Sequence, residues 1–174
     1  IALIDPYMAG FYAQKGTFVT ALRQLGVTKV YEVGLAAFHV INEYEKYIEE
    51  KQPDYAISAF CPSVNLLIKK YYPDLLQYIF PILSPMLAAG KYWKEDDPNC
   101  FTVFFGSCIS KKFERTATGD EVLIDAVVTF DQMESLFRKK GIRVSELSES
   151  VPDMISTRTG RAYAVKNGIS NSIK

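Results

Sequence analysis

Short apolar runs alternate with amphipathic segments along most of the 174-residue chain, and this alternation constrains the fold more than any other feature. The runs are typical of strands, and apolar residues spaced three and four apart are typical of helices. The expected strands are Ile1–Ile4, Val27–Val33, Tyr55–Phe60, Phe101–Phe105 and Val122–Thr129. The expected helices are Thr17–Leu25, Leu35–Lys51, Pro62–Tyr72, Asp74–Phe80, Pro85–Trp93 and Asp131–Lys140. This order predicts an α/β fold, with a mostly parallel twisted sheet flanked by helices on both faces.

The length fits a single domain over residues 1–174 with a core of its own. The pattern weakens from residue 143 to the end, where we expect at most one further strand near Ala162–Val165. The chain begins in a strand-like run without a methionine. We therefore expect these residues to be part of a longer protein.

Charge and hydropathy exclude two classes of partner. Lys and Arg number 20, and Asp and Glu also number 20, so no excess charge indicates binding to nucleic acid. The longest apolar stretch, Tyr78–Gly90, is too short to cross a bilayer and contains two prolines. Three cysteines and no signal peptide indicate a reducing, cytoplasmic location.

Two of the cysteines follow predicted strands. Cys61 comes after Tyr55–Phe60, and Cys108 comes after Phe101–Phe105. Ligands collect at the carboxyl ends of parallel strands, so both sulfurs lie at one edge if these strands are neighbours. Cys61 also precedes a helix, whose N-terminus favours a thiolate, and Lys111 adds positive charge after Cys108. Paired thiolates at such an edge suit a metal ion or an iron–sulfur cluster.

A structural role is the alternative for each of these residues. Free cysteine is among the most buried residue types, and no C-x-x-C spacing marks Cys61 and Cys108 as ligands. Cys100 stands at the start of its strand, and we expect it to be a packed side chain. The only histidine, His39 in "LAAFHVI", is expected in the core rather than as a catalytic base.

Several motifs together resemble the catalytic domain of the iron-only (diiron) hydrogenases. "SAFCPSVNLLIKKYYPDLL" resembles the family's Thr-Ser-Cys-Cys-Pro motif and the helix that ends in Tyr-Tyr-Pro-Glu-Leu. "GSCISKKFE" resembles Met-Pro-Cys-x-x-Lys-Lys-x-Glu, and a Ser-Pro pair lies between the two motifs. "LIDAVVTFDQMESLFRKKGI" and "ALRQLGVTKVYEVGLAA" resemble two further segments, so the resemblance covers nearly the whole chain.

The resemblance implies roles for individual residues. Cys61 and Cys108 match cysteines that bind the 4Fe–4S part of the cofactor. Lys111 matches the lysine that donates a hydrogen bond to a cyanide of the diiron part. Ser84 and Pro85 match the segment that walls this pocket.

The family's third cysteine motif is absent from the sequence. A 4Fe–4S cluster normally needs four protein ligands, and this chain offers two at matching positions. The resemblance therefore implies a 4Fe–4S cluster in the intact parent protein and no cofactor in residues 1–174 alone. The implied partners are the rest of the parent chain, which would supply the other cysteines, and ferredoxin-like or signalling domains.

The residues of the family's proton path are also replaced. Phe60 stands at the position of the proton-transferring cysteine, Tyr44 and Tyr47 at positions of glutamates, and Phe80 at that of a serine. A phenyl ring neither donates nor accepts a proton. Asp5-Pro6-Tyr7 also replaces an Ala-Pro-small segment. The changes remove the relay but retain the two cysteines and Lys111.

The leading hypothesis is an iron–sulfur module of a sensory or redox protein from an anaerobe, with the diiron subsite in doubt. One alternative is a working hydrogenase subunit whose proton path runs through Glu43, Glu45 or Glu114. Another is a metal-free scaffold related to cluster-assembly proteins.

Overall fold

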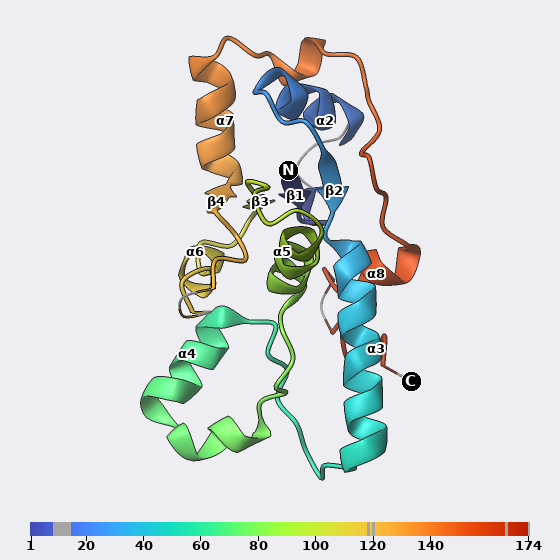
Figure 1. The fold of residues 1–174 in the computed structure, drawn as a ribbon, viewed down its shortest axis with the longest axis vertical. Helices are drawn as coiled ribbons and strands as arrows, with labels where there is room; N and C mark the ends of the chain where they lie inside the picture. Colours follow the sequence, from blue (N-terminus) through green and yellow to red (C-terminus); the bar gives the residue numbers. More distant parts are fainter. Residues whose placement is uncertain (9–14, 118, 120, 166, 174) are drawn as a thin grey trace.

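A parallel sheet with the strand order β2-β1-β3-β4 forms the centre of the computed structural model, which describes residues 1–8, 15–117, 119, 121–165 and 167–173 (Figure 1). The strands are β1 (Ala2–Ile4), β2 (Val30–Glu32), β3 (Val103–Gly106) and β4 (Ala126–Thr129). Every pair of neighbouring strands is parallel. Ile4 lies level with Glu32 on one side and Phe105 on the other, so the carboxyl ends of three strands share one edge.

Helices cover both faces of the sheet, as the sequence predicts (Figure 1). The helices are α2 (Lys15–Gln24), α3 (Gly34–Lys51), α4 (Pro62–Tyr71), α5 (Pro85–Asp96), α6 (Lys111–Glu114), α7 (Phe130–Lys139) and α8 (Arg158–Ala162). Two 3-10 helices, η1 (Pro73–Tyr78) and η2 (Val144–Glu146), complete the elements of the described residues. The bounds differ from the predicted helices by a few residues, and the predicted helix Asp74–Phe80 is the 3-10 helix η1.

The alternation of side chains along the strands makes two cores. Ile4 of β1 and Phe105 of β3 point to one face, where they pack with Phe18 of α2 and Phe137 of α7. Leu3 points to the opposite face and packs with residues of α5. Strands that are buried on both faces need apolar side chains at successive positions, which explains the continuous apolar runs of the sequence.

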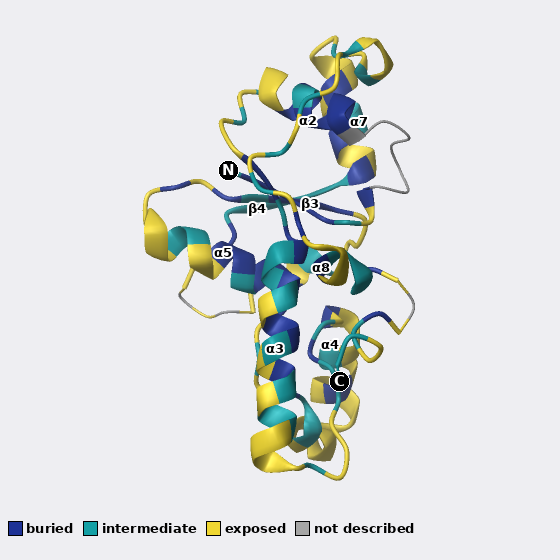
Figure 2. Ribbon diagram, turned by 90° about the vertical axis from the view of Figure 1, so that its right-hand side faces the viewer, coloured by how far each residue is buried: buried dark blue, intermediate teal, exposed yellow. Residues whose placement is uncertain are grey.

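A third apolar cluster lies away from the sheet, along α3 from Val40 to Ile48. Val40 and Tyr44 of α3 pack there with Phe80, and Phe60 lies against them. This part of the molecule has many exposed residues on α4 and at the end of α3 (Figure 2).

The predicted strand Tyr55–Phe60 is wrong. Its only β contact among the described residues is one isolated bridge between Ile57 and Ile79. Side chains bind the backbone of Ala59 instead: its N–H donates to the Tyr44 hydroxyl at 3.0 Å, and its carbonyl accepts from Asn65 at 2.8 Å. These bonds replace the ladder that a neighbouring strand would provide.

The predicted strand Ala162–Val165 is also wrong. Ala162 ends α8, and the following residues form turns. The described residues 143–165 and 167–173 do not form a layer of their own but run along the sheet and helices, where Arg23 contacts Asp153 and α8 packs against α3. His39 is exposed on α3, contrary to its predicted place in the core.

Candidate functional site

The carboxyl edge of the sheet holds the chemistry that the sequence singles out. Cys108 is exposed two residues beyond β3. Cys61 is exposed at the residue before α4, as its position before Pro62 predicts. Cys100 is 8% exposed, and its thiol donates to the Trp93 carbonyl, which confirms the packed role.

Lys111 joins the two cysteine segments. It begins α6, three residues after Cys108, and its Nζ lies 3.4 Å from the carbonyl oxygen of Phe60, the residue before Cys61. The same Nζ lies 2.7 Å from Oε2 of Glu114, and both side chains are largely buried. The Tyr55–Phe60 segment therefore reaches this edge through a side-chain contact rather than through the sheet.

Exposed apolar side chains are frequent on the helices that follow the two cysteines. They belong to α4, η1 and α6, and we call them the α4–α6 surface: Val64, Leu66, Leu67, Tyr71, Leu75, Leu76, Ile109 and Phe113. Ile109 follows Cys108 directly, and Phe113 is 56% exposed on α6. Exposed apolar groups in such number usually mark a contact with another polypeptide.

Ser84 and Pro85 begin α5 and are buried. Ser84 is the residue before the helix, and its hydroxyl oxygen accepts from the Leu87 N–H. Pro85 occupies the first turn, where its missing N–H is no loss. In this structure the pair starts the helix; a role in a cofactor pocket remains a prediction.

The four residues that the resemblance places at relay positions lie together. The Tyr44 ring stacks on Phe80 with centroids 4.1 Å apart and meets the Phe60 ring at 5.4 Å. Tyr47 meets Phe80 edge to face at 5.3 Å. We call these four residues the aromatic cluster. Burial raises the pKa of the Tyr44 hydroxyl, so this group holds its proton more firmly than an exposed tyrosine.

A buried polar group lies next to the aromatic cluster. Asp5 directly follows β1 and is 6% exposed, and its carboxylate accepts hydrogen bonds from the Tyr7 N–H and the Tyr163 hydroxyl. Burial raises the pKa of Asp5, although the two hydrogen bonds and the charge of Lys111 oppose this shift. Burial and the charge of Asp5 also raise the pKa of Tyr163 well above its ordinary value.

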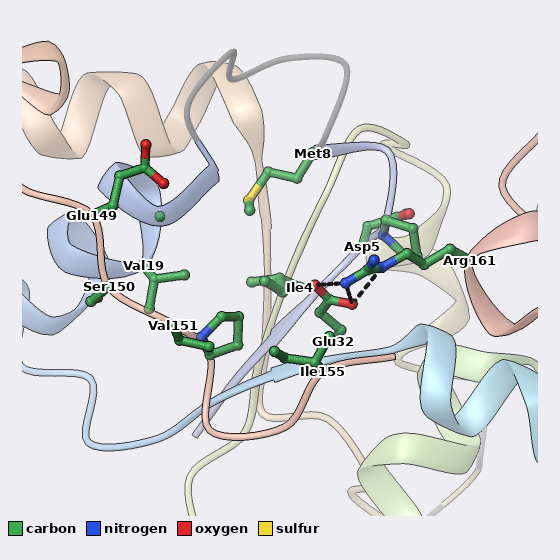
Figure 3. Close-up of a pocket in the computed structure, with 13 residues that line it drawn as sticks. Ile4, Asp5, Met8, Val19, Glu32, Glu149, Ser150, Val151, Ile155 and Arg161 are labelled. Atoms are coloured by element: carbon green, nitrogen blue, oxygen red, sulfur yellow. Dashed lines mark hydrogen bonds and ion pairs between the residues drawn. The ribbon is translucent and has the colours of Figure 1, made fainter. Parts of the chain in front are cut away.

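Asp5 also lines a pocket of about 200 Å³ (Figure 3). Glu32 of β2 and Arg161 of α8 meet in this pocket through two hydrogen bonds of 2.8 Å. The exposed residue Glu149 lies on the other side of the pocket, which therefore reaches the surface.

The thiols of Cys61 and Cys108 have the right chemistry for an iron–sulfur cluster, but they fit only two of its four positions. The described residues contain no group of three His, Cys, Asp or Glu side chains that could hold a metal ion. Cys61 and Cys108 would hold such a cluster, which stores and passes single electrons, only together with ligands from other polypeptide.

Sequence reasoning noticed Asp5 only as a departure from the family and missed Tyr163. An acidic residue placed directly after a buried strand could have indicated Asp5. Nothing in the sequence pairs it with Tyr163, which is 158 positions further along the chain. No described helix is both long enough and apolar enough to span a membrane.

Comparisons with known proteins agree with the resemblance in the motifs. The profile of the family "Iron only hydrogenase large subunit, C-terminal domain" matches residues 5–174. Iron hydrogenase 1 of Clostridium pasteurianum is 31% identical over 154 residues, which are 79% of this chain and 27% of that protein.

Solved structures share the fold. Apo [FeFe]-hydrogenase HydA1 from Chlamydomonas reinhardtii, in a variant form, superposes with a TM-score of 0.71 at 23% identity, over 87% of this chain and 45% of that one. A structure of HydA(deltaEFG), which concerns stepwise assembly of the [FeFe]-hydrogenase H-cluster, gives a TM-score of 0.72 at 23% identity, over 87% of this chain and 44% of that one. The chain thus spans less than half the length of these relatives. It belongs to the family of the C-terminal domain of the iron-only hydrogenase large subunit.

Proposed function

We propose that this domain is a hydrogenase-like iron–sulfur module of a larger redox or sensory protein, and that it does not transfer protons as a hydrogenase does. Cys61 and Cys108 bind the cluster in this proposal, and Lys111 provides positive charge beside it. The parent protein is cytoplasmic and comes from an anaerobe, since an exposed cluster of this kind is sensitive to oxygen.

One observation supports the proposal: Lys111 joins the segments of two exposed thiols, whereas the aromatic cluster fills the positions that the resemblance assigns to the relay. A proton path needs groups that exchange protons near the working pH. Phe60 and Phe80 cannot exchange protons, and the Tyr44 hydroxyl has a raised pKa.

The α4–α6 surface supports a further part of the proposal. We infer that a polypeptide outside residues 1–174 covers this surface and supplies the other cluster ligands. Ferredoxin-like or signalling domains of the parent protein are the expected electron or signal partners.

Anaerobic reconstitution of the parent protein with iron and sulfide tests the ligand assignment. We expect iron–sulfur absorption in the wild type and in Cys100→Ser, and its loss in Cys61→Ser and in Cys108→Ser. An equal iron content in the wild type and all three variants would exclude the assignment of Cys61 and Cys108 as ligands. If that equal iron content is also negligible, the result would favour a metal-free scaffold.

The second candidate is a catalytic hydrogenase with a rerouted proton path. The buried contact between Glu114 and Lys111 favours it, because Glu114 lies at the candidate site, whereas Glu43 pairs with Lys46 on the surface. Rapid dihydrogen evolution by the matured parent protein with a reduced mediator would support this candidate. A large gain in that rate on Phe60→Cys would instead show that the missing relay limits the protein.

A further inference from the structure

Asp5 stands out among the buried charged groups because the nearby cations are matched with other carboxylates. The Lys111 head group bonds Glu114 at 2.7 Å, and the Arg161 guanidinium bonds Glu32 through two atoms. The Asp5 carboxylate has hydrogen-bond donors in Tyr7 and Tyr163, which are neutral. Among the described side chains Asp5 thus has no cation of its own, and a buried carboxylate in this state is unfavourable and readily takes up a proton.

The position of Asp5 places it between the two cysteine segments. Its N–H donates to the Phe105 carbonyl at 2.9 Å, and its Oδ2 lies 3.3 Å from the point where a Cβ on Gly106 would lie. Cys108 follows two residues later. On the other side, the ring of Tyr163 lies 5.9 Å from that of Phe60, which precedes Cys61.

The surroundings allow the carboxyl group to exchange its proton. The pocket beside Asp5 reaches the exposed residue Glu149. The charged and titratable groups that face Asp5 are therefore Tyr7, Tyr163, Lys111, Glu114, Glu32, Arg161 and Glu149. The charges of Lys111 and Glu114 offset each other in one ion pair, and those of Arg161 and Glu32 do so in another. The raised pKa of Tyr163 keeps its hydroxyl protonated. Among these groups, Asp5 is the buried carboxylate that has no ion-pair partner.

We propose that Asp5, held by Tyr163, is a proton-holding site that takes up one proton when negative charge is added at Cys61 and Cys108, and releases it when that charge is removed. The carboxylate and one proton from solvent give the carboxylic acid, and no other bond changes. The proposal rests on the proposed function in one respect: in the parent protein, the added charge is an electron on the iron–sulfur cluster. Proton uptake by Asp5 would give the domain a proton-coupled redox response that does not use the relay positions.

The coupling can be tested without any cluster. In the Cys100→Ser chain, Cys61 and Cys108 are alkylated either with iodoacetate, which adds a carboxylate to each sulfur, or with iodoacetamide, which adds a neutral amide of similar size. Carbon NMR of the aspartate carboxyl groups then gives the pKa of Asp5. We expect a value above the ordinary aspartate value of about 3.9, and a higher value with the iodoacetate adduct than with the iodoacetamide adduct. An ordinary value, or equal values for the two adducts, would overturn the proposal.

One variant tests the pairing with Tyr163. Tyr163→Phe removes a donor to the carboxylate and should raise the pKa of Asp5 further, because the charged form loses a hydrogen bond. Asp153, which bonds Arg23 on the surface, is the internal reference and should titrate identically in all samples. An unchanged pKa of Asp5 in Tyr163→Phe would show that this pair does not hold the proton.

The parent protein provides the final test. If it binds a one-electron cluster, its midpoint potential should fall with rising pH by up to about 59 mV per unit, the equivalent of a tenfold change in proton concentration. Asp5→Asn should flatten this slope, and a slope unchanged in Asp5→Asn would contradict the coupling. Absence of a cluster would refute the proposed function but leave the NMR result intact, so the two failures are distinguishable.

Discussion

Large apolar side chains are buried around the sheet and its flanking helices but exposed in the α4–η1 region. Phe18, Phe104 and Phe137 are almost fully buried around the sheet, whereas Leu67 and Tyr71 of α4 are exposed (Figure 2). The buried side chains of α4 are those of Pro62 and Ile68. The difference indicates that the first region stabilises the fold, whereas the second has the exposed apolar side chains that the proposed contact with another polypeptide would cover.

Phe18→Ala should have the largest effect of the changes considered. The Phe18 ring meets Phe105 and Phe137 edge to face, with centroids 6.4 and 6.1 Å apart. Its removal leaves a cavity between the sheet and two helices, and we expect a loss of about 3–5 kcal/mol in the free energy of unfolding. Chemical denaturation measures this loss.

Leu67→Ala on α4 is the matched control for that experiment. Leu67 is half exposed, so its truncation should change the free energy of unfolding by less than about 0.5 kcal/mol. Similar losses for the two variants would contradict the division between the two regions.

Gly160→Ala probes the contact that holds α8 to the N-terminal end of α3. A Cβ on Gly160 would collide with the carbonyl oxygen of Gly34, the first residue of α3. Backbone cannot yield as a flexible side chain does, so we expect a loss of about 1–3 kcal/mol. Thr159→Ala on the exposed side of α8 should leave stability nearly unchanged, and denaturation of both variants would show whether α8 is docked as described.

Tyr44→Phe tests the polar part of the aromatic cluster. The hydroxyl of Tyr44 accepts the N–H of Ala59, which would otherwise be a buried donor without this partner. We expect a loss of about 1–2 kcal/mol, since an unsatisfied buried donor is unfavourable. Tyr47→Phe, at a partly buried position, should lose less; the reverse order would mean that the Ala59 contact does not stabilise this region.

The smallest effects are changes in pH dependence. The pKa of Asp5 is raised by burial, so its contribution to stability is full below the ordinary aspartate value and is lost as pH rises through the raised value. Asp5→Asn should therefore gain stability relative to the wild type as pH increases through this window.

Asp153→Asn should behave in the opposite way. The hydrogen bond from the Val30 N–H, together with Arg23, lowers the pKa of Asp153, so its stabilising contribution is present above the ordinary value and is lost as pH falls. Thermal unfolding from about pH 2 to about pH 7 compares the two variants, because the contribution of Asp153 is lost only below the ordinary aspartate value. If the stabilities of the two variants changed with pH in the same direction, the opposite pKa shifts of Asp5 and Asp153 would be contradicted.

The sheet could be predicted from the sequence because strands buried on both faces need continuous apolar runs. β1, β2 and β4 lie within predicted strands, and β3 extends one residue beyond its predicted strand, to Gly106. The run Tyr55–Phe60 has the same composition but binds side chains of Tyr44 and Asn65 through its backbone. Composition alone does not show whether a backbone N–H bonds a neighbouring strand or a side chain. The structure of this segment therefore could not be predicted from its sequence.

The candidate site was predictable in part. The start of α4 at Cys61 follows from Pro62, and the buried state of Cys100 follows from its residue type. The contacts of Lys111 with Phe60 and of Asp5 with Tyr163 join residues that are far apart in the sequence, so they depend on the path of the folded chain.

The reactivity of the three thiols tests the central claim most directly. The domain alone and the iron-loaded parent protein are exposed briefly to an alkylating reagent without oxygen, and mass spectrometry measures the modified fraction of each cysteine. We predict that Cys61 and Cys108 react rapidly in the domain alone and Cys100 slowly, and that iron protects Cys61 and Cys108 together. Protection of neither, or of only one of the two, would contradict their assignment as ligands of one cluster.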